Sequence, residues 1–248
     1  MIERLSKNPL ALAALALVAA LVGAGALWLV QLAAPSSLAS ADQARVERVV
    51  HDYVLAHPEI IPEAMDRLRA RETGKAIAAN SDAILKPFGS AWAGNPNGDV
   101  TVVEYFDYNC GYCRASLPNV AQLIASDPKV KVVYRELPIL AETSAAAARL
   151  SLAAADQGKF TAFHDALYAA GQVTPESMAA AAKSAGVDMQ RAAAFAPRAE
   201  AEIASNLAIM RQLGMTGTPS FVIGNHVVSS VLSFEELQKA VAAARAAS

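Results

Sequence analysis

The sequence predicts an α/β protein: a strand–helix–strand unit, a long helical segment, then two strands and a helix. The first observation is a pair of runs rich in β-branched and aromatic residues, Val100 to Phe106 and Val130 to Leu137, a composition enriched in strands. The second is the chain from Thr143 to about Leu213, which favours helix almost throughout. The third is a pair of short strand patterns, Ser220 to Ile223 and His226 to Ser229, before a final helix. Strand, helix and strand in succession favour a parallel pair, so a sheet covered by helices is expected.

Length and composition are those of a folded protein with one mid-sized domain and appendages. Of the 248 residues, 54% are hydrophobic and 18% are charged, and 21 basic against 23 acidic residues give a formal net charge of −2. This balance argues against a disordered chain, which would be poor in apolar residues and rich in net charge. The near-neutral charge, without a long basic run, also argues against nucleic acid as the main partner.

An apolar run near the N-terminus indicates the compartment of the rest of the chain. Arg4 and Lys7 precede an uncharged run from Pro9 to Ala34; about 25 helical residues rise about 37 Å, more than the about 30 Å of a hydrocarbon core. This length favours a retained anchor, whereas Ala39-Ser40-Ala41 has the form of a signal-peptide cleavage site. The positive N-terminal flank stays in the cytoplasm. We therefore expect residues 42–248 on the periplasmic side of the cytoplasmic membrane, anchored by residues 9–34 or released after cleavage near Ala41.

Two short amphipathic helices are expected between residues 42 and 80. Pro58 separates them, because proline removes a backbone donor and disfavours helix in the residue before it. Each helix has an apolar stripe at helical spacing. The stripes consist of Val46, Val49, Val50, Tyr53 and Val54, and of Ile60, Ile61, Ala64, Met65 and Leu68. Such a stalk either packs on the main domain or associates with copies of itself, and the sequence leaves both alternatives open.

The chain is thus expected to have three parts. Residues 1–41 are a signal anchor or signal peptide, residues 42–80 are a helical stalk, and residues 84–248 are the main domain, with a helical insert at about 139–213. The stretch from Gly89 to Gly98 is rich in Gly, Pro and Asn and is expected to be a loop. Turn and cap residues mark the ends of later elements. They are Gly158, Gly171, Thr174 with Pro175, Gly186, Gly224 with Asn225, and Ser233 with Glu236.

The two cysteines of the chain, Cys110 and Cys113, lie three residues apart where the strand from Val100 passes into a helix. In a first helical turn this spacing brings the Cα atoms within the about 4.4–6.8 Å that a disulfide allows. The helix N-terminus, with unpaired N–H groups and the positive end of the dipole, favours the thiolate of Cys110, and Gly111 leaves one sulfur approachable. A stabilised thiolate makes the disulfide a better oxidant. The pattern predicts a reversible dithiol–disulfide pair.

A structural disulfide and a metal site are the other interpretations of this pair. A structural disulfide normally closes a longer loop, where its effect on chain entropy is larger. A tetrahedral metal site needs further ligands, and the histidines show no paired spacing. They are His51, His57, His164 and His226. A Cu(I) carrier built on the two thiolates stays open as the alternative function.

The motif Cys110-Gly111-Tyr112-Cys113 between a strand and a helix, together with the later Gly217-Thr218-Pro219-Ser220-Phe221-Val222-Ile223, resembles the thioredoxin superfamily. The long helical insert resembles the DsbA-like branch of that superfamily. The resemblance covers about residues 84–248 and implies a thioredoxin-like fold. It also implies that Cys110 is an exposed nucleophile, that Cys113 is a buried resolving thiol, and that Thr218 and Pro219 form a cis peptide bond in a loop that binds extended substrates.

Glu104, six residues before Cys110, matches a buried acid beneath the active site in that family. A carboxyl inside an apolar strand should have a raised pKa and can exchange a proton with Cys113. Pro118 matches the proline inside the active-site helix. Four further neighbours of the cysteines are candidates for a substrate groove or for tuning the thiols: Tyr108 and Tyr112 for the groove, and Asp107 and Arg114 for tuning.

The resemblance implies a thiol-disulfide oxidoreductase that uses no cofactor besides its own redox-active cysteine pair. Asn109 stands where thioredoxin has Trp, and Gly111-Tyr112 resembles the dipeptide of periplasmic disulfide isomerases rather than that of strong oxidants. Residues 42–80 resemble the N-terminal region of DsbA-like proteins that trimerise, act as isomerases and are often described with copper tolerance. The implied clients are unfolded or misoxidised exported proteins. The implied recycling partner is a quinone-linked membrane oxidase or a membrane thiol reductase.

Overall fold

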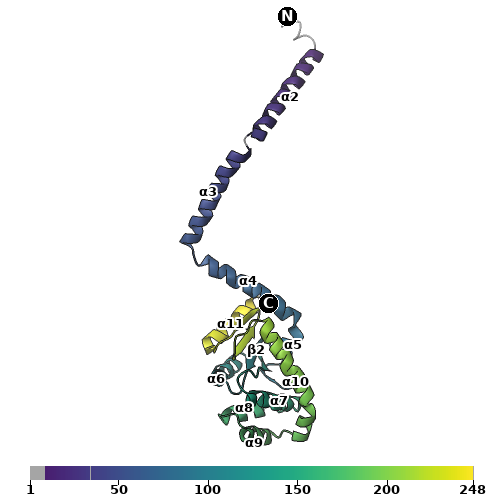
Figure 1. Cartoon of the computed structure of the whole chain (residues 1–248), viewed down its shortest axis with the longest axis vertical. Helices are drawn as coiled ribbons and strands as arrows, with labels where there is room; N and C mark the ends of the chain where they lie inside the picture. The colour runs from purple at the N-terminus through teal and green to yellow at the C-terminus, as the bar shows by residue number, and fades with distance from the viewer. Residues whose placement is uncertain (1–8, 34, 248) are drawn as a thin grey trace. The chain divides into compact units, whose positions relative to one another are not determined.

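Figure 1 shows the computed structural model of the chain, which describes residues 9–33 and 35–247. The chain divides into two units, one up to Met65 and one from Asp66 onward. The first unit contains α2 (Pro9–Ala33), α3 (Pro35–Ala56) and the start of α4 (Ile60–Ala79). The later elements are α5 (Ser81–Leu85), β1 (Trp92–Gly94), β2 (Val100–Phe106), α6 (Gly111–Ser126), β3 (Val130–Glu136), α7 (Glu142–Asp156), α8 (Phe160–Ala169), α9 (Pro175–Ala185), α10 (Met189–Gln212), β4 (Ser220–Ile223), β5 (His226–Val228) and α11 (Phe234–Ala246).

Among the described residues, α2 is the helix long and apolar enough to cross a membrane, through the segment Ala13–Val30. Large side chains such as Leu17 and Leu21 are exposed along it. A helix that is apolar on every face is typical of a membrane span or a signal sequence. The flanking Arg4 and Lys7, and the side chains of the predicted cleavage motif at 39–41, lie outside the part of the chain that the structure describes.

The prediction of two stalk helices separated near Pro58 is confirmed, because α3 ends at Ala56 and α4 begins at Ile60. The first helix is longer than predicted, since it starts at Pro35. The apolar stripe of α3 is exposed, with Val46, Val49, Val50 and Tyr53 between 55% and 62% accessible.

The five strands form one sheet in the order β1-β3-β2-β4-β5. β2 and β3 are parallel, in register from Val100↔Val130 to Phe106↔Glu136, whereas β4 is antiparallel to β2 and β5 is antiparallel to β4. The predicted parallel pair and C-terminal hairpin are therefore confirmed. Because α6 connects β2 to β3, the N-terminus of α6 lies at the carboxyl end of β2, where Cys110 is found.

Helices cover both faces of the sheet, and the alternation of side chains along β2 shows which helices lie on each face. Val102 packs with residues of α6 and α11, including Val120 and Leu237. Val103 packs in the cluster on the other face, which contains Ile209 of α10 and residues of α4 and α5. Burying a side chain of this size fully contributes about 1.5–3 kcal/mol relative to exposure. Since Glu104 alternates with Val103, it points toward the face covered by α6.

The predicted loop from Gly89 to Gly98 is wrong in part, because it contains the strand β1. β1 pairs antiparallel with β3 through Trp92↔Val133, Ala93↔Val132 and Gly94↔Lys131. Gly98 has no room for a side chain, since a Cβ there would lie 2.6 Å from the backbone oxygen of Lys129. The Gly and Asn residues that suggested a loop thus permit this segment to approach β3 closely. Nothing in the local sequence indicates the pairing of β1 with β3.

The chain between β3 and β4 is helical as predicted, and Figure 1 shows α7, α8 and α9 gathered at one end of the second unit. The expected caps are present. Thr174 and Ser233 cap α9 and α11 through their side chains, and Gly186 ends α9 in the left-handed conformation with φ of 69°.

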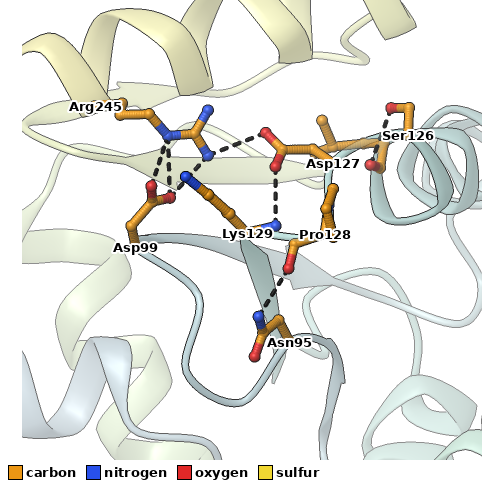
Figure 2. Close-up of polar contacts among 8 residues, drawn as sticks. Asn95, Asp99, Ser126, Asp127, Pro128, Lys129 and Arg245 are labelled. Carbon is orange, nitrogen blue, oxygen red and sulfur yellow. Dashed lines mark hydrogen bonds and ion pairs between the residues drawn. The ribbon is translucent and has the colours of Figure 1, made fainter.

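An ion-pair network ties the end of α11 to the end of the β2–α6 unit opposite Cys110 (Figure 2). Arg245 donates to both carboxylate oxygens of Asp99 at 2.7–3.0 Å and to Asp127 at 3.0 Å. Asp127 also accepts from the backbone N–H of Lys129 at 2.9 Å, and Asn95 donates to the carbonyl of Pro128 at 2.7 Å. Hydrogen bonding to Arg245 lowers the pKa of Asp99.

Arg245→Met should lower the melting temperature of the second unit at pH 7, and the difference from wild type should disappear as the pH falls. The sign follows from Asp99, because a lowered pKa in the folded state gives stability that is present above the ordinary carboxyl range and lost as the group is protonated below about pH 4. Thermal unfolding of Arg245→Met, Asp99→Asn and the double variant measures this coupling. Strictly additive effects of the two substitutions would contradict it.

Candidate active site

The two cysteines lie at the N-terminus of α6. Cys110 is the N-cap residue, with extended backbone at φ −83° and ψ 112°, and its sulfur accepts from the backbone N–H of Cys113 at 3.4 Å. Both cysteines are free thiols. Because the sulfur of Cys110 receives a helical N–H group, this position stabilises negative charge on that sulfur.

Cys110 is less exposed than the resemblance implied. It is 5% accessible, and Cys113 is fully buried. The reason is the loop before β4, since the Cys110 thiol donates to the carbonyl oxygen of Thr218 at 3.2 Å. Gly111 next to it is exposed, and a Cβ built there would meet no atom within 4 Å. The approach to Cys110 is therefore over Gly111.

The loop that covers Cys110 contains the cis peptide bond between Thr218 and Pro219, as predicted. Ser220 holds this loop by donating to the carbonyl of Gly217 at 2.6 Å and by a 2.7 Å hydrogen bond to the hydroxyl of Ser229. The backbone of Thr218 is thus fixed beside the sulfur of Cys110, although 108 residues separate the two in sequence.

Glu104 is buried in β2, 2% accessible, between Tyr134 of β3 and Phe221 of β4. Burial raises its pKa to about 8. One of its carboxyl oxygens has no hydrogen-bond partner among the groups that the structure describes. Burial also raises the pKa of the Cys113 thiol, and the charge of Glu104 adds to that increase.

Asp107 supports the loop before Cys110. Its carboxylate accepts from the backbone N–H groups of Asn109, Ile139 and Leu140 at 2.8–3.1 Å, and its carbonyl accepts from the hydroxyl of Tyr168 at 3.1 Å. These contacts give Asp107 a positioning role for the loop, rather than direct contact with the sulfur of Cys110.

Two other expectations for the residues around the cysteines are revised. Tyr108 does not border a groove. It is 1% accessible, and its hydroxyl lies 2.9 Å from Ser151 and 3.3 Å from His164 in an aromatic cluster. Arg114 points away from Cys110: it donates to the carbonyl of Gly171 and lies over the ring of Tyr168 at 5.8 Å. Pro118 lies inside α6, as the resemblance implied.

Tyr112 is 72% accessible, and the side chains of Ile139 and Leu140 are also exposed. Asp107 brings this pair to the site, because it binds their backbone N–H groups. Sequence reasoning missed Ile139 and Leu140, and it also missed Tyr168, because each lies 30 residues or more from Asp107 and only the folded chain brings them together.

The described residues contain no group of three or more His, Cys, Asp and Glu side chains placed to hold a metal ion. What the arrangement offers chemically is a pair of neighbouring buried thiols, with Cys110 lying between the Thr218 carbonyl and the exposed Gly111, and a buried carboxyl on β2.

Comparison with known families and structures finds matches of both kinds for this chain. The family model described as Thioredoxin matches residues 88–243, and the model described as the N-terminal domain of the copper resistance protein ScsC matches residues 42–73. A thioredoxin-like oxidoreductase from Silicibacter pomeroyi is 43% identical, with 68% of this chain and 99% of that one covered and a TM-score of 0.64. The thiol-disulfide exchange protein α-DsbA2 from Wolbachia pipientis is 31% identical, with 71% and 97% covered and a TM-score of 0.64.

A curated relative, the Na(+)/H(+) antiporter NhaA 1 from Salinispora arenicola, is 31% identical over 150 residues. The match covers 58% of this chain and 23% of the antiporter. This chain therefore corresponds to a minor part of that protein.

Proposed function

This chain belongs to the thioredoxin family, and from that premise we propose that it is an extracytoplasmic thiol-disulfide oxidoreductase that forms or isomerises disulfide bonds in exported proteins. The observation that carries the proposal is the pair of free thiols at the N-terminus of α6, with the sulfur of Cys110 against the carbonyl of Thr218. Such a pair, one sulfur reachable and one buried, is suited to exchange rather than to a permanent cross-link.

In the reducing direction, the Cys110 thiolate attacks one sulfur of a client disulfide. A mixed disulfide forms and the other client sulfur leaves as a thiolate. The Cys113 sulfur then attacks Cys110, so that the Cys110–Cys113 disulfide forms and the second client sulfur is released. Two electrons pass from the enzyme to the client; the reverse sequence oxidises the client. Isomerisation results when the released client thiolate attacks the mixed disulfide before Cys113 does.

Glu104 assists the second step, because Cys113 must lose its proton before it attacks. The raised pKa of the Glu104 carboxyl, about 8, lies close to neutral pH, where a carboxyl can both accept and return a proton. Thr218 and Pro219 present the loop backbone to an extended client chain, and Tyr112 with Ile139 and Leu140 offers it an apolar surface.

The direction of electron flow depends on a membrane partner. A quinone-linked oxidase would keep the cysteine pair oxidised, and a membrane thiol reductase would keep it reduced for isomerisation. The helix α2, apolar along Ala13–Val30, supports a location at the periplasmic side of the cytoplasmic membrane, either anchored there or released by cleavage. The enzyme needs no cofactor besides Cys110 and Cys113.

Cys113→Ala should accumulate a mixed disulfide with a scrambled client protein such as oxidised ribonuclease, because the resolving sulfur is missing while Cys110 still attacks. Non-reducing electrophoresis and mass spectrometry of the adduct measure this. Cys110→Ala is the matched control and should form no adduct, since its remaining cysteine is fully buried. Adduct formation by Cys110→Ala, or none by Cys113→Ala, would contradict the assigned roles.

We also propose that the stalk at 42–80 joins copies of this chain into a homo-oligomer. The apolar stripe of α3 is exposed, and burying it against the same stripe of another copy would remove it from water. Light scattering of the full chain in detergent should give a multiple of 25.9 kDa, and Val49→Asp should reduce it toward a single copy. Ala44→Asp, outside the stripe, should keep the oligomer. A single-copy mass for the unaltered chain would overturn this proposal.

The second candidate function is a periplasmic Cu(I)-binding protein, favoured by the two neighbouring free thiols. Two thiolates can hold Cu(I) linearly, and this soft ion prefers sulfur ligands. A competitive Cu(I) titration in the presence of physiological concentrations of thiols tests it: Cu(I) that is readily lost to those thiols would reject this candidate in favour of exchange.

A further inference from the structure

A polar cleft of about 580 Å³ lies in the second unit between α4 and the β4–β5 hairpin. α4 contributes Asp66, Arg69, Ala70 and Thr73 to its lining, and the hairpin contributes Asn225 and His226. None of these residues is part of the cysteine site.

α4 is held close to the hairpin on this side. A Cβ built at Gly74 would lie 2.9 Å from the side chain of Asn225, so the helix passes close to the turn at this point. Three residues later, Ile77 is 5% accessible and packs in the core cluster with Val103 and Val222. The helix that forms one wall of the cleft is therefore anchored to the folded unit near its C-terminal end.

The cleft is continuous with the loop that covers Cys110. Thr216 and Ser229 line it; the backbone N–H of Thr216 donates to the hydroxyl of Ser229 at 3.3 Å, and Ser229 in turn bonds Ser220 behind the cis peptide. Thr216 precedes Thr218 by only two residues, and Thr218 contacts the sulfur of Cys110. An extended chain advances about 3.3 Å per residue, so a chain lying along this loop reaches the cleft within a few residues of Cys110.

The chemistry of the lining fits an extended polypeptide. β5 is the last strand of the sheet, and Val227 of β5 lines the cleft, so the strand can present an edge there. A strand edge offers backbone donors and acceptors to an added chain. Thr73 and Asn225 supply side-chain donors and acceptors that suit backbone amides of any sequence, whereas Arg69 already donates to Asp66 at 3.2 Å.

We propose that this cleft binds the segment of a client polypeptide that lies about three to five residues from its reacting cysteine, so that α4 takes part in client binding. The inference rests on the proposed function and names where the client chain runs beyond the cysteine site. The occupant of the cleft is an extended unfolded chain that is attached through its cysteine to Cys110.

Three peptides test the proposal, each with one cysteine in a mixed disulfide with glutathione: a tripeptide, and two nonapeptides extended by six uncharged residues on the N-terminal or the C-terminal side. The reduced full chain in detergent micelles attacks this disulfide through Cys110, glutathione leaves as a thiolate, and Cys113 then releases the peptide thiol. One of the two nonapeptides should react about tenfold faster than the tripeptide, as two added hydrogen bonds of modest net strength would allow.

Ala70→Trp fills the cleft and should remove this gain. Ala78→Trp places the same side chain on an exposed position of the same helix outside the cleft lining and should retain it. Both variants should react with the tripeptide at the rate of the unaltered chain.

Equal rates for all three peptides, or an undiminished gain in Ala70→Trp, would overturn the cleft proposal. Failure of the tripeptide itself to react would instead overturn the proposed function. A photo-crosslinking residue at the fourth position from the cysteine gives a measurement that needs no variant: it should label the cleft lining, for example at Thr216, Ser229 or Thr73, and labelling confined to residues outside that lining would contradict the proposal.

Discussion

Replacing Cys110 by serine should lower the rate of disulfide exchange by about a thousandfold or more, to the uncatalysed level, because the attacking sulfur is lost. Cys113 cannot replace it, since its sulfur is fully buried and burial raises the pKa of its thiol. The fold should survive, because serine is a good N-cap residue and its hydroxyl can accept the N–H of Cys113 that the Cys110 sulfur now accepts.

Comparison with Cys110→Ala separates the two roles of Cys110, as the attacking sulfur and as the N-cap of α6. Both variants should be inactive in a single-turnover assay with a small disulfide, whereas Cys110→Ala should be less stable than Cys110→Ser by about 1 kcal/mol, the usual effect of losing an N-cap. Measurable turnover by Cys110→Ser at more than a few per cent of the unaltered rate would show that another group carries the chemistry.

Much of the fold and the chemistry of this site could be predicted from the sequence because the signals are local. Val100 to Phe106 is a run of strand-forming residues, and the cysteine pair follows it directly, so the position of the thiols at a helix N-terminus required no knowledge of distant contacts. The burial of Glu104 was implied by the resemblance, together with its place in an apolar strand, and it is confirmed. The cis bond at Pro219 was predicted from the resemblance to the thioredoxin superfamily rather than from the residues themselves.

The features that could not be predicted all depend on contacts across long stretches of sequence. Cys110 is covered by the carbonyl of Thr218, 108 residues away, so its low exposure has no local signal. Tyr108 is directed into the core by Ser151 and His164 of the helical insert, although its sequence position fits a groove equally well. β1 exists only through its pairing with β3. In each case a side chain or strand is defined by a partner that the local pattern does not identify.

Glu104→Gln should remove a pH dependence from the free energy of unfolding of the second unit. In the unaltered protein, this dependence should amount to a change on the order of 4 kcal/mol between pH 4 and pH 9. The pKa of Glu104 is raised to about 8 in the folded protein by burial, against an ordinary value near 4.5. A raised carboxyl pKa means that the folded state holds the proton more tightly than the unfolded state. The contribution of the Glu104 proton to the stability of the folded state is therefore fully present below about pH 4.5 and is lost as the pH rises through about 8. The unaltered protein should lose stability across this range relative to the variant.

Urea unfolding of both proteins at several pH values measures how the difference in their free energies of unfolding varies with pH. An effect of the buried amide that is the same at every pH does not alter this variation. The same substitution should lengthen the lifetime of the mixed disulfide at pH 7 by about tenfold to a hundredfold, because Cys113 then lacks the carboxyl that takes its proton.

Glu136→Gln is the matched control, since Glu136 is also a buried carboxyl whose pKa is raised by burial. Glu136→Gln should also weaken the pH dependence of stability, but it should leave the mixed-disulfide lifetime unchanged. If both variants lengthen that lifetime equally, general disturbance of the buried strands accounts for the effect and Glu104 has no specific role. If the stability difference for Glu104→Gln is flat from pH 4 to pH 9, the pKa of Glu104 is not raised in the folded protein, and its carboxylate is too weak a base to take the proton of Cys113.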